Sequence, residues 1–188
     1  LVRGLSRIAA PLRSLMTPKL RPGNDSPYYF ETCYWERRVT PLRTVPASAK
    51  PVLSVIIPAY DQWAHTRRAI ASVAADAGDI QCEVILADDA SNDDTVSAKD
   101  IPGLVVLRSE KNLGFLRNCN NAARSAQGDY LLFLNNDAEL LPGACRALID
   151  TVQSADDIGV VGGRLLFPNG RLQEEQSSAD HSEDRKST

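Results

Sequence analysis

The sequence predicts an α/β fold in which a mostly parallel sheet carries helices on both faces. From residue 52 onward, short runs rich in Val, Ile and Leu alternate with segments of helical periodicity. Only 6% of the 188 residues are aromatic, so small aliphatic side chains carry most of the apolar mass. This composition suits a packed sheet with covering helices better than a small all-β module. A chain of this length has room for one such domain plus tails.

The alternation also predicts an order of elements. Strands are expected at 52–57, 83–87, 104–107, 130–134 and 158–161, and helices at 64–75, 115–126 and 142–154. This alternation of strands and helices implies a mostly parallel sheet, because a helical crossover lets the next strand run in the same direction as the one before. Ligands of parallel sheets bind beyond the carboxyl ends of the strands. The residues that follow each strand are therefore the candidates for function.

Proline content and charge divide the chain into three regions. Residues 1–50 form a basic leader and a proline-rich connector, with nine Lys or Arg against three Asp or Glu. Residues 51–172 form the domain, and residues 173–188 form a polar tail that we expect to be disordered. The leader spaces leucines at helical intervals among arginines and is interrupted at Pro11. Through residues 1–22 it either makes a peripheral contact with an anionic membrane face, or it packs on the domain or stays loose.

Composition argues against several classes of protein. Beyond residue 50 the chain has twelve basic residues against twenty-one acidic ones, the opposite of a nucleic-acid-binding balance. The four cysteines stand apart, without the spacing of a zinc site or a disulfide framework, so we expect reduced and mostly buried thiols. No apolar run reaches the length of a membrane span, and we expect no integral membrane segment.

Polar residues follow three of the expected strands, at 58–61, 88–91 and 135–137. Carboxylates gathered at the ends of buried strands repel one another unless water, a ligand or a cation intervenes. Hard divalent cations favour such oxygen ligands. Asp and Asn at these positions also cap helices and start turns, so both interpretations stay open for the group as a whole.

Five charged residues near these strand ends receive structural interpretations. Asp93 and Asp94 are typical of the capped entrance to a short helix around residues 92–95. Asp88 is expected to brace its loop. Arg108 and Lys111 are interpreted as surface charges.

Four motifs together resemble family 2 glycosyltransferases. They occupy residues 55–60, 88–95, 112–115 and 133–137 and read VIIPAY, DDASNDDT, NLGF and FLNND. Each motif stands at an expected strand end or helix start, and the set follows the order and spacing of that family. The resemblance covers about two thirds of the chain. It implies the GT-A fold, a Rossmann-like nucleotide-binding sheet.

The resemblance implies a nucleotide site on the first two strand ends. Pro58, Ala59, Tyr60 and Asp89 would hold the base and ribose of a nucleotide sugar. A carboxylate accepts hydrogen bonds from an imino group or a ribose hydroxyl, and Tyr60 offers a flat apolar face. Asp61 stands where the family usually has Asn.

Residues 135–137 resemble the DxD-type element of the family. Asp137 would bind Mn²⁺ or Mg²⁺ bridging the donor diphosphate, because a cation stabilises the charge that develops on the leaving group. Asn136 would bond a ribose hydroxyl or coordinate through its carbonyl. Arg117 resembles the basic residue that follows the glycine motif: it reaches the nucleotide or its phosphates, or it is an exposed arginine on a solvated helix face.

The activity implied by the resemblance is that of an inverting, hexosyl-type glycosyltransferase. The donor would be a UDP-, GDP- or dTDP-linked sugar, and the acceptor a glycan or a lipid-linked glycan. The implied setting is bacterial cell-surface polysaccharide synthesis on the cytoplasmic side of the membrane, with a possible peripheral contact to its inner face.

The likeness ends near residue 174, and we expect the acceptor half to be missing. Neither His65 nor His181 has the setting of a catalytic base, so the general base is unidentified. A truncated nucleotide-sugar-binding module without transferase activity is therefore the alternative. An unrelated doubly wound protein, such as a phosphoacceptor receiver domain, would need a lysine that the sequence lacks between Asp137 and the tail.

Overall fold

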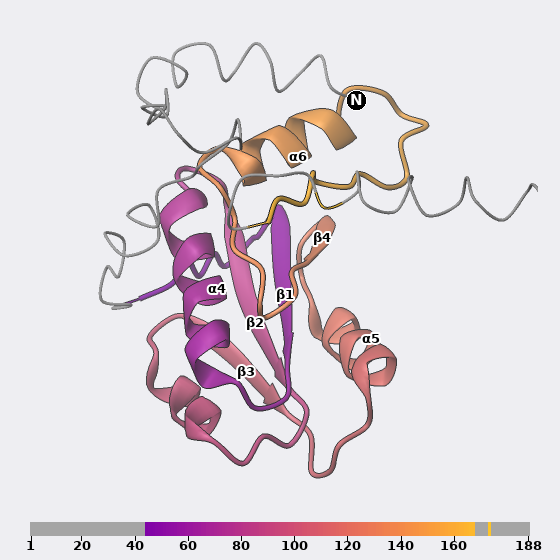
Figure 1. Ribbon diagram of the computed structural model, residues 1–188. Helices are drawn as coiled ribbons and strands as arrows, with labels where there is room; N and C mark the ends of the chain where they lie inside the picture. The colour runs from indigo at the N-terminus through magenta and orange to yellow at the C-terminus, as the bar shows by residue number, and fades with distance from the viewer. Residues whose placement is uncertain (1–43, 168–172, 174–188) are drawn as a thin grey trace, which may run out of the picture. The chain divides into compact units, whose positions relative to one another are not determined.

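A computed structural model describes residues 44–167 and residue 173. The chain divides into two compact units, and Val39–Arg146 forms the unit that holds the whole sheet. This sheet has four parallel strands in the order β3-β2-β1-β4 (Figure 1). The strands are β1 (Leu53–Ala59), β2 (Cys82–Asp88), β3 (Leu104–Arg108) and β4 (Tyr130–Phe133). The predicted parallel α/β architecture is confirmed.

The two central strands are buried along their whole length. Every residue of β1 and β2 is buried, and most of them are β-branched or aliphatic. Such uniform burial is expected of a parallel strand covered on both faces, because neither face of the sheet meets water. Ile56 pairs in register with Ile85 and packs with Ala87 and Ala122 in a core cluster.

The crossovers place helices on opposite faces of the sheet. Helix α4 (Trp63–Asp76) connects β1 to β2, whereas α5 (Phe115–Ser125) connects β3 back across the sheet to β4. Connections between parallel strands are right-handed as a rule, and two that run in opposite directions then cover opposite faces. The strand order therefore reverses between β1 and β4. The crevice at such a reversal is where ligands bind in open α/β sheets.

The remaining elements differ in part from the sequence-based expectations. The predicted short helix around residues 92–95 is a 3₁₀ helix, η1 (Asp94–Asp100), and α6 (Ala144–Val152) begins two residues after the expected start at Pro142. Gly143 precedes α6 with φ 84°, a conformation that suits glycine and continues no helix. The side chain of Asp76, at the end of α4, caps the start of α6 by accepting hydrogen bonds from the backbone amides of Gly143 and Cys145.

The predicted fifth strand at 158–161 is wrong. These residues have no regular secondary structure, and Val160 is 90% exposed. The run reads Ile-Gly-Val-Val, which has the composition of a strand but no sheet neighbour among the described residues. β-propensity alone does not form a strand without a partner to pair with.

The chain joins the sheet earlier than the expected start at Pro51. The amide of Val45 donates to the carbonyl of Pro102 at 3.0 Å, and Ala47 forms an antiparallel bridge with Glu83. Residues 1–43, which include the predicted basic leader and its membrane contact, lie outside the described residues, as does nearly all of the predicted tail.

The cysteines in the described residues are free thiols, as predicted. Cys82, Cys119 and Cys145 are buried, and burial raises the pKa of each thiol above its ordinary value. The nearby Asp76 carboxylate raises the pKa of Cys145 further. A thiol with a raised pKa is a poor nucleophile, so these residues serve packing. Cys33 lies outside the described residues.

Asp93 caps two helices at once, which extends the capping role predicted for it. One carboxylate oxygen accepts from the amide of Thr95 at 3.0 Å, and the other accepts from the amide of Trp63 at 2.8 Å. The N-cap residue of α4 itself, Gln62, makes no side-chain cap. Burial opposes ionisation of Asp93, but the hydrogen bonds from Thr95 and Trp63 leave its pKa below the ordinary value of 3.8.

Asp93→Ala is predicted to lower the free energy of unfolding by about 1–2 kcal/mol, the usual cost of losing a helix cap. Because the folded-state pKa is depressed, this stabilisation is present above pH 3.8 and is lost as the pH falls through the lower folded value. Urea unfolding at several pH values measures both effects. Asp94→Ala, which removes an exposed neighbouring acid, is the control. Equal losses in the two variants would contradict the capping role.

Candidate donor and metal site

A cavity of about 330 Å³ opens at the carboxyl ends of the strands, where the strand order reverses. It is formed by the segment after β1, the first acid after β2, the start of α5 and the segment after β4. Its lining residues are Pro58, Ala59, Tyr60, Gln62, Asp89, Asn112, Gly114, Phe115, Asn118, Asn135, Asn136 and Asp137. Six of the seven residues predicted to bind nucleotide or metal are therefore brought together.

The seventh predicted residue, Arg117, does not line this cavity. It is exposed on the first turn of α5. Its neighbour Asn118 does line the cavity, and the Asn118 side chain is buried and donates to the carbonyl of Ala87 at 2.7 Å. The interpretation of Arg117 as a nucleotide-binding residue stays a prediction.

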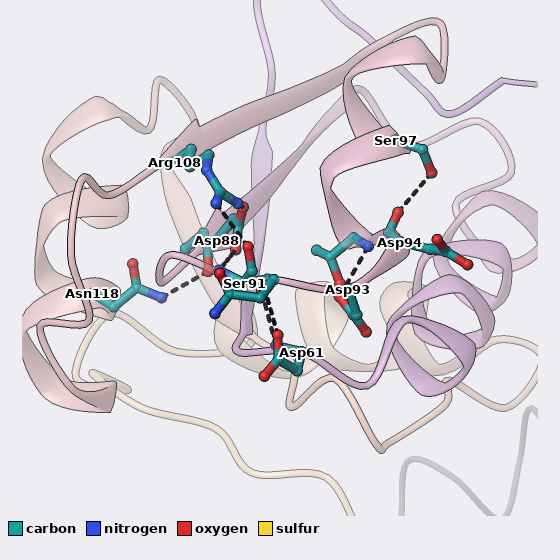
Figure 2. Close-up of polar contacts among 11 residues, drawn as sticks. Asp61, Asp88, Ser91, Asp93, Asp94, Ser97, Arg108 and Asn118 are labelled. Carbon is teal, nitrogen blue, oxygen red and sulfur yellow. Dashed lines mark hydrogen bonds and ion pairs between the residues drawn. The ribbon is translucent and has the colours of Figure 1, made fainter.

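Asp88 braces the loop after β2, as expected, but its ion-pair partner was not predicted. The Asp88 side chain is 1% exposed; it accepts from the amide of Ser91 at 2.9 Å and forms an ion pair with Arg108 (Figure 2). Arg108 also donates to the carbonyl of Ser91 at 2.7 Å. Arg108 lies at the surface, as predicted, with 43% of its side chain exposed, but its ion pair gives it a structural role that was not predicted. It is the cation that compensates a buried carboxylate, which the sequence could not show because the two residues meet only through the pairing of β2 with β3.

Asp89 lines the cavity and also binds the loop that leads into α5. Its two carboxylate oxygens accept from the amides of Leu113 and Gly114, at 2.8 and 2.9 Å. Gly114 has φ 82°, so the loop turns there in a conformation that favours glycine. Each oxygen of an ionised carboxylate has a second acceptor position, so Asp89 can receive a ligand hydrogen bond while it holds the loop.

Reciprocal hydrogen bonds join the loops that follow β1 and β2. The amide of Asp61 donates to the Ser91 hydroxyl at 2.8 Å, and the Asp61 carboxylate accepts from the amide of Asn92 at 2.7 Å (Figure 2). Asp61, Gln62 and Ala90 all have positive φ, between 56° and 65°. Left-handed backbone at such residues costs on the order of 1 kcal/mol each and persists only where surrounding contacts impose it. These three residues lie in the loops that follow β1 and β2, and one of them, Gln62, lines the cavity.

Aromatic rings are available at the same rim. Tyr60 is 50% exposed and Phe115 is 62% exposed, and both line the cavity. Exposed rings beside hydrogen-bonding groups are typical of sites that bind flat ligands such as nucleotide bases. Phe115 was part of a recognised motif, but its own role was not predicted.

Asp137 differs from the other acids of the site. It is exposed on the cavity, and within residues 44–167 its carboxylate has no hydrogen-bond or ion-pair partner. No group of three or more His, Cys, Asp or Glu side chains suited to a metal occurs in the described part of the chain. Mg²⁺ and similar cations at phosphate sites need only one or two carboxylates, with phosphate oxygens and water completing the coordination. Asp137 with the neighbouring amide oxygens of Asn135 and Asn136 fits that kind of site.

A second hollow, of about 390 Å³, lies between the end of β3 and α5. Its lining includes Ser109, Lys111, Asn121 and Ser125. It holds none of the acids predicted to bind a ligand.

Arg108→Met is predicted to destabilise the protein by about 2–3 kcal/mol, because it strands the Asp88 carboxylate without its cation. The double variant Asp88→Asn with Arg108→Met should lose less than the sum of the two single losses. Arg124→Met, on the exposed face of α5, is the control. Chemical denaturation measures all four, and an effect of Arg108→Met no larger than that of Arg124→Met would contradict the assignment.

Comparison with known proteins connects this site to a family. Residues 54–187 match glycosyl transferase family 2. An uncharacterized protein of Mycobacterium tuberculosis is 38% identical over 103 residues, which are 53% of this chain and 32% of that protein. A GalNAc(5)-diNAcBac-PP-undecaprenol beta-1,3-glucosyltransferase of Campylobacter jejuni is 35% identical over 136 residues, 68% of this chain and 42% of that enzyme.

Among solved structures, the Staphylococcus aureus protein TarS in complex with UDP-GlcNAc aligns with 58% of this chain and 37% of its own, at 22% identity and a TM-score of 0.49. None of the described helices is long and apolar enough to cross a bilayer. The matched part of this chain covers less than half the length of each of these three proteins, namely 32%, 42% and 37%. The family match extends over most of the chain and contains every strand end that forms the cavity, and on this basis the chain belongs to glycosyl transferase family 2.

Proposed function

We propose that the cavity binds a nucleoside-diphosphate sugar, and that the protein transfers the sugar to a glycan or lipid-linked acceptor. The observation that carries this proposal is that two acids with different surroundings, Asp89 and Asp137, line the same cavity. Asp89 is fixed by two backbone amides, whereas Asp137 has no partner among the described residues. The first suits recognition of a nucleoside, and the second suits a cation on a diphosphate.

The nucleoside would occupy the side of the cavity formed by β1 and β2. Pro58, Ala59 and Tyr60 line that side together with Asp89. The exposed Tyr60 ring offers a stacking face, and the free acceptor positions of Asp89 offer hydrogen bonds to a base or ribose. UDP-, GDP- and dTDP-sugars all present such groups.

The diphosphate would occupy the side formed by the segment after β4. A bound Mn²⁺ or Mg²⁺ would neutralise the charge that develops on the departing nucleoside diphosphate. Asp137 would hold the cation, and Asn136 would supply a carbonyl oxygen or bond a ribose hydroxyl. The acidic Asp137 and the neutral Asn135 and Asn136 give this side a single formal negative charge, so the phosphates themselves would provide much of the cation's binding energy.

The proposed chemistry is transfer of a hexose with inversion. The acceptor hydroxyl would attack the anomeric carbon, the bond from that carbon to the phosphate oxygen would break, and the hydroxyl proton would pass to a general base. Within the described residues we assign no group to that role.

The proposed setting is synthesis of a bacterial cell-surface polysaccharide, on the cytoplasmic side of the membrane. The names of two relatives support the polysaccharide part of this proposal: the Campylobacter jejuni glucosyltransferase named for its undecaprenol-linked substrate, and the O-antigen biosynthesis protein RfbC of Myxococcus xanthus, which is 32% identical over 133 residues.

Asp137→Ala is predicted to abolish Mn²⁺-dependent binding of the nucleoside diphosphate, because it removes the only carboxylate proposed to hold the cation. Isothermal titration with UDP, GDP and dTDP, with and without Mn²⁺, measures the effect. The matched control is Asp129→Ala, an exposed acid at the opposite end of β4. The proposal fails if Asp137→Ala binds like the parent while the parent shows Mn²⁺-dependent binding.

A further inference from the structure

Side chains along helix α4 hold the segment that carries Asp137 at successive points. The side-chain amide of Asn136 donates to the Thr66 hydroxyl at 3.1 Å, and the backbone amide of Leu140 donates to the Ser72 hydroxyl at 2.9 Å. Further along, Asp76 accepts from the amides that begin α6. Ten residues of helix separate Thr66 from Asp76, a rise of about 15 Å. The segment after β4 is therefore fastened along most of the helix.

An ion pair fastens the same segment on the other side of Asp137. The Nε atom of Arg68 lies 3.4 Å from a carboxylate oxygen of Glu139, and the Arg68 guanidinium also contacts His65 Nδ1 at 2.8 Å. Glu139 is two residues beyond Asp137, and Asn136 is the residue before it. The only exposed acid of this stretch is thus flanked by two side chains tied to α4.

Thr66 is well suited to fix the orientation of Asn136. It is 0% exposed, and its hydroxyl lies 3.4 Å from the carbonyl of Gln62, a bond at the limit of the accepted distance. A hydroxyl that donates to this carbonyl keeps its lone pairs for the Asn136 amide nitrogen. The Asn136 amide oxygen is then left as an acceptor for a ligand or cation beside Asp137.

We propose that Thr66 is a positioning residue for the cation site: it sets Asn136, and with the Arg68–Glu139 pair it holds Asp137 in the geometry that the cation needs. This inference rests on the proposed function. It adds to that function two residues outside the cavity lining, Thr66 and Arg68, that would control cation binding. Small cations demand near-ideal coordination geometry, so residues behind the ligands affect affinity strongly. Loss of such outer contacts typically costs 10–100-fold in metal affinity.

The test compares Thr66→Val with Thr66→Ser. Valine keeps the shape of threonine but removes the acceptor for Asn136, whereas serine keeps the hydroxyl. Mn²⁺ affinity is read from the free-Mn²⁺ electron paramagnetic resonance signal, in the presence of whichever of UDP, GDP or dTDP the parent binds. Nucleotide affinity without metal and the melting temperature are measured alongside.

Thr66→Val should weaken Mn²⁺ about 10–100-fold while nucleotide affinity without metal stays within about twofold, and Thr66→Ser should restore Mn²⁺ affinity. Unchanged Mn²⁺ affinity in a folded Thr66→Val protein would overturn the inference. So would an equal loss of metal-dependent and metal-free binding, which would indicate a general structural role. A parent that binds no nucleotide with Mn²⁺ would instead refute the proposed function itself.

A second variant tests the Arg68–Glu139 part of the proposal and keeps it falsifiable if Thr66→Val does not fold. Arg68→Gln breaks the pair with Glu139 at a side chain that is 54% exposed. Removing a positive charge near a cation site should strengthen Mn²⁺ binding if charge alone matters. Positioning predicts the opposite sign, a loss of Mn²⁺ affinity that Arg68→Lys partly restores. Unchanged or tighter Mn²⁺ binding by Arg68→Gln would overturn the role of the pair.

Discussion

Complete burial of β1 and β2 is the constraint on which the rest of the structure depends. Strands covered on both faces can carry no uncompensated polar side chain along their length, so polar chemistry is confined to their ends. The parallel arrangement brings the carboxyl ends of β1, β2 and β4 to one edge of the sheet. The reversal of strand order between β1 and β4 then opens the crevice in which the acids meet.

The acids at this edge divide into those that build the site and one that is available to a ligand. Asp88 is buried and paired with Arg108, Asp61 ties two loops together, and Asp93 caps two helices. Asp89 has both functions, since it holds the α5 loop and also lines the cavity. Asp137 alone among these acids has no partner in the described ranges. The structural acids hold the loops around the cavity by hydrogen bonds and an ion pair.

The sequence predicted the features that local patterns determine. The continuous apolar runs identified all four strands of the sheet, and polar strand ends identified most of the cavity. It failed where a feature depends on distant partners. The run at 158–161 has strand composition but no neighbouring strand among the described residues. Arg108 is at the surface as predicted, but its ion pair was not foreseen because the buried partner, Asp88, lies on another strand. Thr66 gave no signal at all, since its contact with Asn136 joins residues 70 positions apart.

The most direct test of the account is a map of the backbone amides that respond to a nucleoside diphosphate. An isotope-labelled sample of this 20.5 kDa chain can be titrated with UDP, GDP and dTDP in the presence of Mg²⁺ and followed by nuclear magnetic resonance. The account predicts shifts concentrated at residues 59–62, 112–115 and 135–137, around the cavity. Shifts centred on the second hollow, at Ser109, Asn121 and Ser125, or no response to any nucleotide from a folded chain, would contradict it.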